Sequence, residues 1–417
     1  MNTTEIGKFK SRALQWASKF DVCCCLDSSG YSDNYSQFDC LIAVGSTQQL
    51  TINAGESFSA LRKFYQQHKT WMFGLLSYEL KNETDHLIST HDDELGFPDL
   101  FFFVPKFLIA IHNKNVEILI GNPGILEEIN QLRLDMDDLT TSLTIEQRLS
   151  KDAYINAIDK LREHIKRGDI YEVNFCQEFF AKNAKINPLF IYQSLNALSP
   201  TPFAGFFKID DLYILSATPE RFLCKRGNKL ISQPIKGTAK RNVNKEEDEN
   251  IKRELRASAK EQAENVMIVD LVRNDLTKSA TKGTVRVDEL FGIYTFPQVH
   301  QMISTISCEL RPDIHFIDAL KNTFPMGSMT GAPKIKAMEL IDKYEMSKRG
   351  AFSGSFGCIS PTGDFDFNVI IRSILYNSTT RYLSFQVGGA ITYASNPEAE
   401  YEECLLKASA IMKILKK

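Results

Sequence analysis

The sequence predicts an α+β fold with large, mostly antiparallel β-sheets. Short apolar runs recur along the chain, and Asn, Asp and Gly separate them, a pattern typical of β-strands. Several of these runs follow one another closely, as the strands of hairpins do. Longer stretches between them carry apolar residues three or four positions apart, which indicates helices. Strands dispersed among helices in this way favour the α+β class.

The first third of the chain contains clear strand signals. Apolar runs predict strands at 22–26, 40–44, 71–76 and 116–120. The stretch 127–150 is polar and lacks strong periodicity, which indicates a boundary or a crossing segment. We therefore expect an N-terminal region at 1–145 and a second region at 150–417, which together form one compact unit.

The second region opens with a helix. Asp152 is a suitable N-cap, apolar residues recur from Ile155 to Ile165, and Gly168 is a stop signal. The pattern then predicts further strands at 212–215, 230–234, 365–375 and 382–387, and further helices at 245–274, 333–344 and 397–415.

Composition excludes several classes of function. The chain has 417 residues and a net charge of −3, which gives no basis for binding nucleic acid or an anionic membrane. Apolar stretches such as 101–105 and 107–111 are too short to cross a membrane. The N-terminus lacks the apolar core of a signal peptide. The nine cysteines form no CxxC pair, and free thiols in a reducing compartment are expected. We therefore expect a cytoplasmic protein.

The last predicted helix carries charged residues on one face. Asn396 is a good N-cap, and Glu400, Glu403 and Lys407 follow at a spacing that projects all three from the same side. Two carboxylates one turn apart can hold a hard cation beside an anionic substrate. The alternative is a solvated face with one Glu–Lys pair.

A second acidic residue of interest is Glu264, which lies in a segment with apolar residues on both sides. A buried glutamate without a local partner is either protonated or faces a cation. Asp270 and Arg273, one turn apart, can pair with each other as part of the scaffold. Structural and functional interpretations of Glu264 both stay open.

Glycine-rich segments supply three further candidates. The turn 324–334 runs into a helix and, with Thr330, can hold an anion, although it lacks the Gly-Lys-Ser/Thr ending of a P-loop. Gly388 and Gly389 interrupt a strand pattern, which indicates a bulge or a close backbone approach. Lys236 stands on a turn before Gly237 and is either a solvated lysine or a nucleophile with a lowered pKa.

Seven segments in order resemble the chorismate-utilising enzyme family, which includes anthranilate synthase component I, aminodeoxychorismate synthase component I, isochorismate synthase and salicylate synthase. The resemblance implies two large sheets packed face to face and flanked by helices, with chorismate in a cleft between them. The resemblance to the family covers roughly residues 152–417. The residues before this range match the family less closely, and 74–78 match best among them. The segments are 217–222, 234–241, 263–275, 325–333, 350–354, 367–373 and 388–407.

The resemblance also implies roles for individual residues. Glu264 and Glu403 correspond to Mg²⁺ ligands, with Glu400 close by. Glu220 corresponds to the general acid that assists departure of the ring C4 hydroxyl. The residues implied to bind the substrate are Arg372, Lys407, Thr330, Gly237, Thr238, Gly388 and Gly389.

Within this family, Lys236 points to the aminodeoxychorismate synthase branch. There the equivalent lysine is thought to attack ring C2, after which ammonia adds at C4 and expels the lysine. Other branches generally carry alanine and add their nucleophile directly at C2. The resemblance therefore implies conversion of chorismate and ammonia to 4-amino-4-deoxychorismate, on the way to 4-aminobenzoate and folate. Anthranilate synthase component I and a non-catalytic chorismate-binding subunit are the alternatives.

The sequence departs from the family pattern at two positions, and the family pattern implies one partner protein. Glu172 replaces the general-base lysine of isochorismate-type enzymes, which disfavours activation of water, and the sequence assigns it no role. Gln301 replaces a histidine common in the family, with His300 one place earlier. None of the cysteines lies in the Gly-x-Cys-x-Gly motif of a glutaminase. The family pattern therefore implies that a separate glutamine amidotransferase subunit supplies ammonia.

Overall fold

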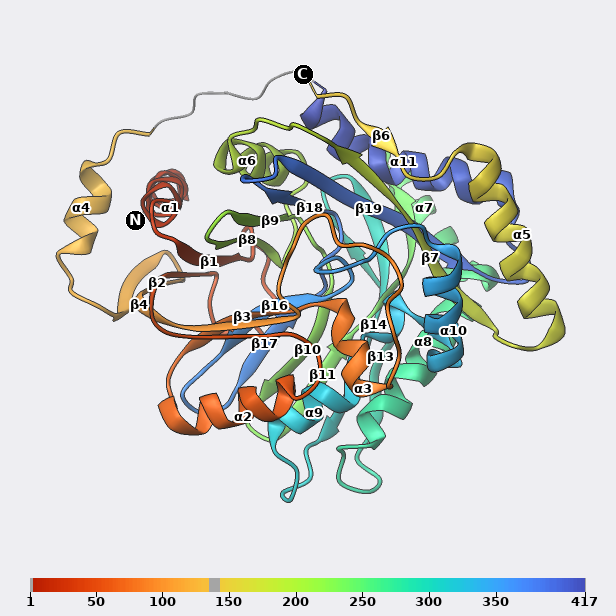
Figure 1. Cartoon of the computed structure of the whole chain (residues 1–417), viewed down its shortest axis with the longest axis horizontal. Coiled ribbons are helices and arrows are strands. Elements are labelled where there is room, and N and C mark those ends of the chain that lie inside the picture. Colours follow the sequence, from red (N-terminus) through yellow and green to blue (C-terminus); the bar gives the residue numbers. More distant parts are fainter. Residues whose placement is uncertain (1–2, 135–142, 417) are drawn as a thin grey trace.

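The computed structural model describes residues 3–134 and 143–416. Part of the predicted boundary segment, residues 135–142, lies outside the described residues. Helices pack around a large central assembly of strands (Figure 1). The helices are α1 (Thr3–Ala17), α2 (Ser57–His68), α3 (Lys81–Thr84), α4 (Ile125–Gln131), α5 (Lys151–Arg167), α6 (Pro188–Leu198), α7 (Lys245–Ala257), α8 (Ala259–Thr277), α9 (Phe316–Thr323), α10 (Lys334–Tyr344) and α11 (Pro397–Leu415), with 3₁₀ turns at Tyr78–Leu80 and Gly327–Met329.

All pairings between the described strands are antiparallel, which confirms the predicted α+β class. The first strands are β1 (Val22–Asp27), β2 (Cys40–Ile52), β3 (Met72–Leu76), β4 (Leu100–His112), β5 (Asn115–Ile120), β6 (Glu146–Gln147), β7 (Glu172–Ala181), β8 (Ala204–Ile209) and β9 (Leu212–Ser216). The others are β10 (Arg221–Arg226), β11 (Lys229–Gln233), β12 (Ile235–Lys240), β13 (Arg286–Thr295), β14 (Val299–Glu309), β15 (Gly331–Ala332), β16 (Ser355–Ile359), β17 (Phe365–Asn368), β18 (Ser373–Asn377) and β19 (Tyr382–Ile391).

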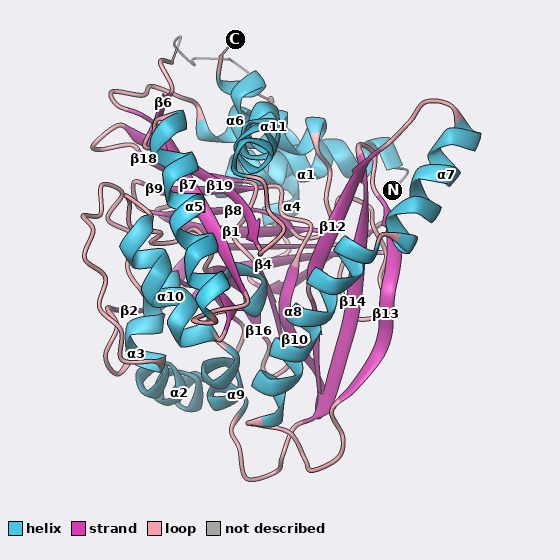
Figure 2. Cartoon of the chain, turned by 90° about the vertical axis from the view of Figure 1, so that its right-hand side faces the viewer, coloured by secondary structure: helices cyan, strands magenta, loops and turns pink. Residues whose placement is uncertain are grey.

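Hydrogen bonds link the strands of the two expected sheets into one continuous, strongly curled network. From one edge, the neighbours run β13, β14, β11, β10, β17, β16, β3, β4, β2, β1, β8, β9, β18, β19 and β7. Figure 2 shows β12, β13 and β14 running steeply beside a second group of strands that contains β1, β4 and β8. The curl brings strands that are far apart in this order close together, which is how the site described below is assembled.

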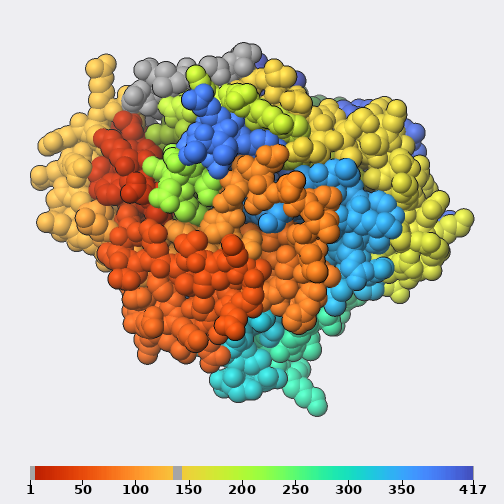
Figure 3. Space-filling view, viewed as in Figure 1, coloured from red at the N-terminus to blue at the C-terminus, as the bar shows by residue number. Residues whose placement is uncertain are grey.

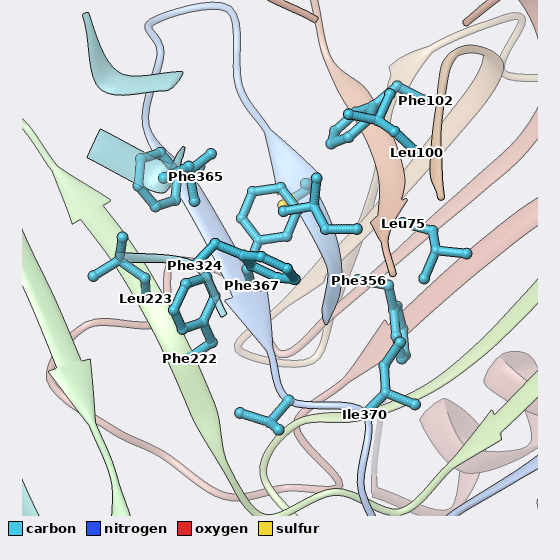
Figure 4. Close-up of a cluster of buried hydrophobic side chains, with 14 of the residues drawn as sticks. Leu75, Leu100, Phe102, Phe222, Leu223, Phe324, Phe356, Phe365, Phe367 and Ile370 are labelled. Atoms are coloured by element: carbon cyan, nitrogen blue, oxygen red, sulfur yellow. The ribbon is translucent and has the colours of Figure 1, made fainter. Parts of the chain in front are cut away.

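The two regions expected from the sequence share this sheet. Strand β1 pairs with β8, and β3 pairs with β16, so hydrogen bonds cross from the N-terminal part of the chain to the C-terminal part. Figure 3 shows N-terminal segments packed directly against C-terminal ones on the viewed face. Figure 4 shows part of the core, where the rings of Phe102, Phe222, Phe356 and Phe367 come from four different strands.

Most predicted elements are present, and three details differ. Ser150 rather than Asp152 caps α5, because its side chain accepts a hydrogen bond from the amide of Ala153. The predicted helix at 245–274 is two helices, since Ser258 ends α7 and caps α8. The predicted strand at 365–375 is broken into β17 and β18 at Arg372. Among the described residues, no helix is long and apolar enough to cross a bilayer.

Candidate active site

The candidate site lies where strands from distant parts of the sheet come together. Lys236 is the second residue of β12, Glu220 directly precedes β10, and Glu172 is the first residue of β7. Strands β11 and β12 both pair with β14, and β11 also pairs with β10. Because the sheet curls, the start of β7 lies beside β12. Glu172 and Lys236, which are 64 positions apart in the sequence, therefore make contact.

Lys236 and Glu172 form a buried ion pair in this site. Lys236 Nζ donates a hydrogen bond to Glu172 Oε1 over 2.9 Å. Glu172 is 1% exposed, and its other oxygen, Oε2, has no hydrogen-bond partner in the described part of the chain. The sequence alone assigned Glu172 no role, and the structure identifies it as the direct partner of Lys236.

The charge state of Lys236 follows from two opposing effects. Burial alone lowers the pKa of an amine, because the charged form loses its hydration. The negative charge of Glu172, with further contributions from Glu264 and Glu220, outweighs burial and raises the pKa of Lys236 above its usual 10.5. The resting lysine is therefore protonated, and it has to transfer a proton before it can act as a nucleophile.

Replacing Glu172 with glutamine is expected to lower the pKa of Lys236. The amide preserves the size of the side chain but removes its charge, so burial dominates and favours the neutral amine. The neutral amine of the variant should therefore form at a lower pH than in the wild-type protein. The pH dependence of Lys236 labelling by an amine-reactive reagent, followed by peptide mass spectrometry, measures this shift. Lys240, exposed on the same strand, is the internal control; an unchanged labelling profile at Lys236 would contradict the expectation.

Glu220 is the second buried carboxyl group beside Lys236. Its Oε1 accepts a hydrogen bond from Ser328 Oγ over 2.6 Å. Burial raises the pKa of Glu220 to about 7, although Ser328, Lys236 and the backbone amide of Ile235 all favour the charged form. A carboxyl group with this pKa is partly protonated at neutral pH, which suits a general acid.

A buried ion pair holds the turn that carries Ser328. Arg349 Nη2 lies 2.6 Å from Glu345 Oε1, and both side chains are almost fully buried. The same guanidinium donates hydrogen bonds to the backbone carbonyls of Met329 and Asn174, over 2.6 and 2.9 Å. Arg349 thereby ties the turn to β7, the strand that carries Glu172.

Replacing Arg349 with methionine is expected to lower the free energy of unfolding by about 3–5 kcal/mol, because it leaves Glu345 buried without its cation. Chemical denaturation followed by tryptophan fluorescence measures the change. Arg273→Met is the matched control: Arg273 and its predicted partner Asp270 do pair, at 2.7 Å, but their side chains are 51% and 60% exposed. Removing that exposed pair should change the stability by only about 0–1 kcal/mol. Equal effects of the two substitutions would refute the structural role of Arg349.

Arg372 provides an unpaired cation. It lies just before β18 with a φ of +50°, which is uncommon for a residue other than glycine. Its guanidinium makes no hydrogen bond or ion pair with any described residue, and burial lowers its pKa. Arg372 lines a small cavity together with Thr201 and Gln301, whose buried side-chain oxygens accept no hydrogen bond from any described residue. An unpaired guanidinium beside unused polar groups is well suited to bind a carboxylate.

Glu400, Glu403 and Lys407 share one face of α11, as the sequence pattern indicated, and this face lies against the glycine pair of β19. Glu400 Oε2, Lys407 Nζ and Glu403 Oε1 lie 3.4, 3.6 and 3.8 Å from the position that a Cβ would take on Gly389. Lys407 pairs with Glu403 over 2.7 Å and donates a hydrogen bond to the carbonyl of Gly388 over 2.9 Å. The absence of a side chain at Gly389 thus leaves space beside two carboxylates and an amine.

Glu264 of α8 faces the same region. Lys260 lies 3.9 Å from Glu264, and its charge also acts on Glu400 and Glu403. Burial raises the pKa of Glu264 to about 7 and also raises that of Glu400. Burial opposes ionisation of Glu403 as well, but Lys407 outweighs it and the pKa of Glu403 is lowered.

These carboxylates suit a magnesium ion. In the described part of the chain, no three His, Cys, Asp or Glu side chains form a complete metal-binding cluster. Mg²⁺ does not require one, because it is usually held by one or two carboxylates together with water and ligand oxygens. The desolvated carboxylates of Glu264 and Glu400 are the kind of donor that a cation would stabilise in the charged form. The assignment of Glu264, Glu400 and Glu403 as metal ligands stays a prediction.

The remaining predicted substrate residues differ in their accessibility. Gly237 has a φ of +97°, and a Cβ there would lie 3.0 Å from Glu261 Oε2, so glycine allows α8 to approach β12. Thr238, the next residue, is exposed. Thr330 is fully buried, and its hydroxyl donates to the backbone carbonyls of Met326 and Gly327. The hydroxyl of Thr330 is therefore already used within its own turn.

Two other features noted in the sequence have structural roles. A side chain on Gly388 would collide with the carbonyl oxygen of Phe175, so the close approach is between β19 and β7. His300 is fully buried, and its Nε2 lies 2.9 Å from Asp248, which also binds Arg241. His300 thus connects β14 to α7.

The site combines a buried acid, Glu220, a buried amine, Lys236, and the unpaired guanidinium of Arg372, a set of groups that suits an enzyme acting on a small anionic substrate. The sequence profile of the chorismate binding enzyme family matches residues 21–413. The chain therefore belongs to the chorismate binding enzyme family.

Individual relatives agree with this assignment. The chain is 31% identical over 423 residues to aminodeoxychorismate synthase component 1 of Escherichia coli, covering 93% of this chain and 92% of that protein. It is 39% identical over 277 residues to aminodeoxychorismate synthase of Streptomyces griseus, covering 66% of this chain and 38% of that longer protein. The fold is similar to that of anthranilate synthase component I from Streptococcus pneumoniae, with a TM-score of 0.79 and 24% identity over 91% of this chain and 93% of that one.

Proposed function

We propose that this protein is an aminodeoxychorismate synthase component I, which converts chorismate and ammonia to 4-amino-4-deoxychorismate. The observation that carries the proposal is the buried Lys236, paired with Glu172 and close to the charge of Glu220. An enzyme that adds its nucleophile directly at ring C2 has no use for a second nucleophile in this place. The similarity to aminodeoxychorismate synthases supports the same reaction.

Arg372 and Lys407 are the cations proposed to bind the substrate, and Lys407 is also paired with Glu403. Arg372 has no partner among residues 3–134 and 143–416, so its fork of donors is free for one of the two carboxylates of chorismate. Lys407, already close to the backbone of Gly388, can contact the other. Mg²⁺, held by Glu264 and Glu403 with Glu400 nearby, would bind the ring carboxylate and favour the charge that develops during rearrangement.

The first chemical step joins Lys236 to the ring. Lys236 transfers a proton to Glu172, and its neutral Nζ forms a bond to ring C2. The two conjugated double bonds shift toward C4, and the C4–O bond breaks. Glu220 donates its proton to the departing hydroxyl, which leaves as water.

The second step replaces the lysine by ammonia. Ammonia forms a bond to C4, the double bonds shift back, and the C2–Nζ bond breaks so that Lys236 leaves as a neutral amine. The extra proton on the new C4 amine returns to Glu220, and Glu172 returns its proton to Lys236. The residues end in their starting states, and the net reaction consumes chorismate and ammonia and releases 4-amino-4-deoxychorismate and water.

A separate glutamine amidotransferase subunit is proposed as the source of ammonia, and the cytoplasm as the site of action. All nine cysteines are free and buried in the structure, as expected in a reducing compartment. Free ammonium should replace the partner in vitro.

Product analysis tests the proposed function. The protein is incubated with chorismate, Mg²⁺ and ammonium, and the products are separated by chromatography and identified by mass spectrometry. Formation of 4-amino-4-deoxychorismate supports the proposal. Prompt formation of fluorescent anthranilate would instead identify an anthranilate synthase component I, and complete recovery of chorismate would identify a non-catalytic binding subunit.

A further inference from the structure

We propose that Ser328 is a positioning residue that orients the general acid Glu220 through its hydroxyl group. The assignment of Glu220 as an acid rests on the proposed function, whereas the contact itself does not. Ser328 Oγ donates to Glu220 Oε1 over 2.6 Å, and the two residues are 5% and 4% exposed. Ser328 thereby fixes Oε1, one of the two carboxyl oxygens of Glu220.

Ser328 is itself held firmly. Asn174 Nδ2 donates to the carbonyl oxygen of Ser328 over 2.9 Å, and the amide of Asn174 donates to the carbonyl of Thr330 over 2.8 Å. Arg349 binds the intervening carbonyl of Met329. Three successive carbonyls of the turn are therefore fixed, so the serine hydroxyl approaches Glu220 from one direction.

The other charged groups around Glu220 do not replace this contact. Lys236 and Arg372 favour the charged form through space, with smaller effects than the hydrogen bond from Ser328. Asp275 lines the cavity next to Glu220 but is paired with Lys334 and Lys278. The side chain of Arg221, the next residue, is paired with Asp33 and Asp366. Ser328 is thus the principal group that opposes the effect of burial on Glu220.

Loss of the hydroxyl should therefore have two consequences. Without its strongest hydrogen bond to the charged form, Glu220 should titrate about one pH unit higher in Ser328→Ala, as expected for a hydrogen bond to a charged group. Without a fixed orientation, the acid should also be less effective when it is protonated. We expect kcat at pH 6, below the raised pKa of Glu220, to fall on the order of tenfold.

The experiment measures the titration of Glu220 directly by infrared difference spectroscopy, with the carboxyl band assigned from Glu220→Gln. Ser328→Thr keeps a hydroxyl and should titrate close to the wild-type protein. Ser384→Ala is the matched control, because Ser384 is another buried serine that donates to a buried glutamate, Glu178 Oε1, over 2.7 Å. Ser328→Cys, with a weaker donor of similar size, provides the same test if Ser328→Ala does not fold.

A raised titration pH in Ser328→Ala, restored in Ser328→Thr and absent in Ser384→Ala, would support the proposal. An unchanged titration of Glu220 in Ser328→Ala, or an equal shift in Ser384→Ala, would overturn it. The infrared measurement needs no substrate. If the wild-type protein makes no aminated product, the proposed function is wrong. The titration of Glu220 in the variants still shows whether Ser328 orients this carboxyl group.

Discussion

Lys236→Ala is expected to lower the rate of 4-amino-4-deoxychorismate formation by about three orders of magnitude or more, since it removes the nucleophile of a covalent mechanism. Alanine cannot bond to ring C2, so ammonia has no C2 adduct from which to reach C4. The loss should appear in kcat rather than in KM, because Arg372 and Lys407, the groups proposed to bind the carboxylates, are unchanged. Steady-state assays with ammonium, with product identity checked by mass spectrometry, measure the effect.

Lys240→Ala is the matched control for this substitution. Lys240 lies on the same strand, β12, but is exposed and paired with no described residue. It should retain the wild-type rate. Continued formation of 4-amino-4-deoxychorismate at the wild-type rate by Lys236→Ala would show that the covalent role is wrong.

Glu220→Gln is expected to lower kcat by roughly 10²–10⁴-fold, the range typical of general acid catalysis. Glutamine preserves the size of the side chain and can still accept a hydrogen bond from Ser328, but it has no proton to give to the departing hydroxyl. Because burial raises the pKa of Glu220 to about 7, the protonated and active form is lost as the pH rises above that value. The wild-type kcat should therefore decrease on the alkaline side, and this dependence should disappear in the variant.

A glutamate outside the site provides the comparison. Glu309, exposed at the end of β14, can be replaced by glutamine with no expected effect on kcat or on its pH dependence. Retention of the wild-type kcat by Glu220→Gln would exclude Glu220 as the acid.

Much of the secondary structure could be predicted, because the residues that determine helix ends and helix faces lie close together in the sequence. Helix α11 has the predicted bounds, and Asn396 caps it because its side-chain oxygen accepts a hydrogen bond from the amide of Ala399. The position of Glu400, Glu403 and Lys407 on one face of this helix likewise follows from helical spacing alone. The broken strand at Arg372 was missed, because nothing in the sequence there signals a left-handed residue.

The contacts that give the site its chemistry could not be predicted in this way. Lys236 meets Glu172 across 64 positions, and Ser328 meets Glu220 across 108. Both contacts depend on the curled path of the sheet, which no local pattern encodes. The charge state of Lys236 shows the consequence: sequence reasoning considered a lowered pKa, whereas the pairing with Glu172 raises it. The resemblance to a known family identified the residues, and the structure identifies their partners.

The intact mass of the protein after incubation with chorismate and Mg²⁺, without ammonia, tests the covalent role of Lys236 most directly. Without ammonia the second step cannot occur, so we expect a protein heavier by chorismate minus one water, with the added mass on the peptide that contains Lys236. Adding ammonium should remove the adduct and release 4-amino-4-deoxychorismate. The covalent role of Lys236 would be excluded by an unmodified protein that still converts chorismate and ammonium to that product, or by an adduct that also forms on Lys236→Ala.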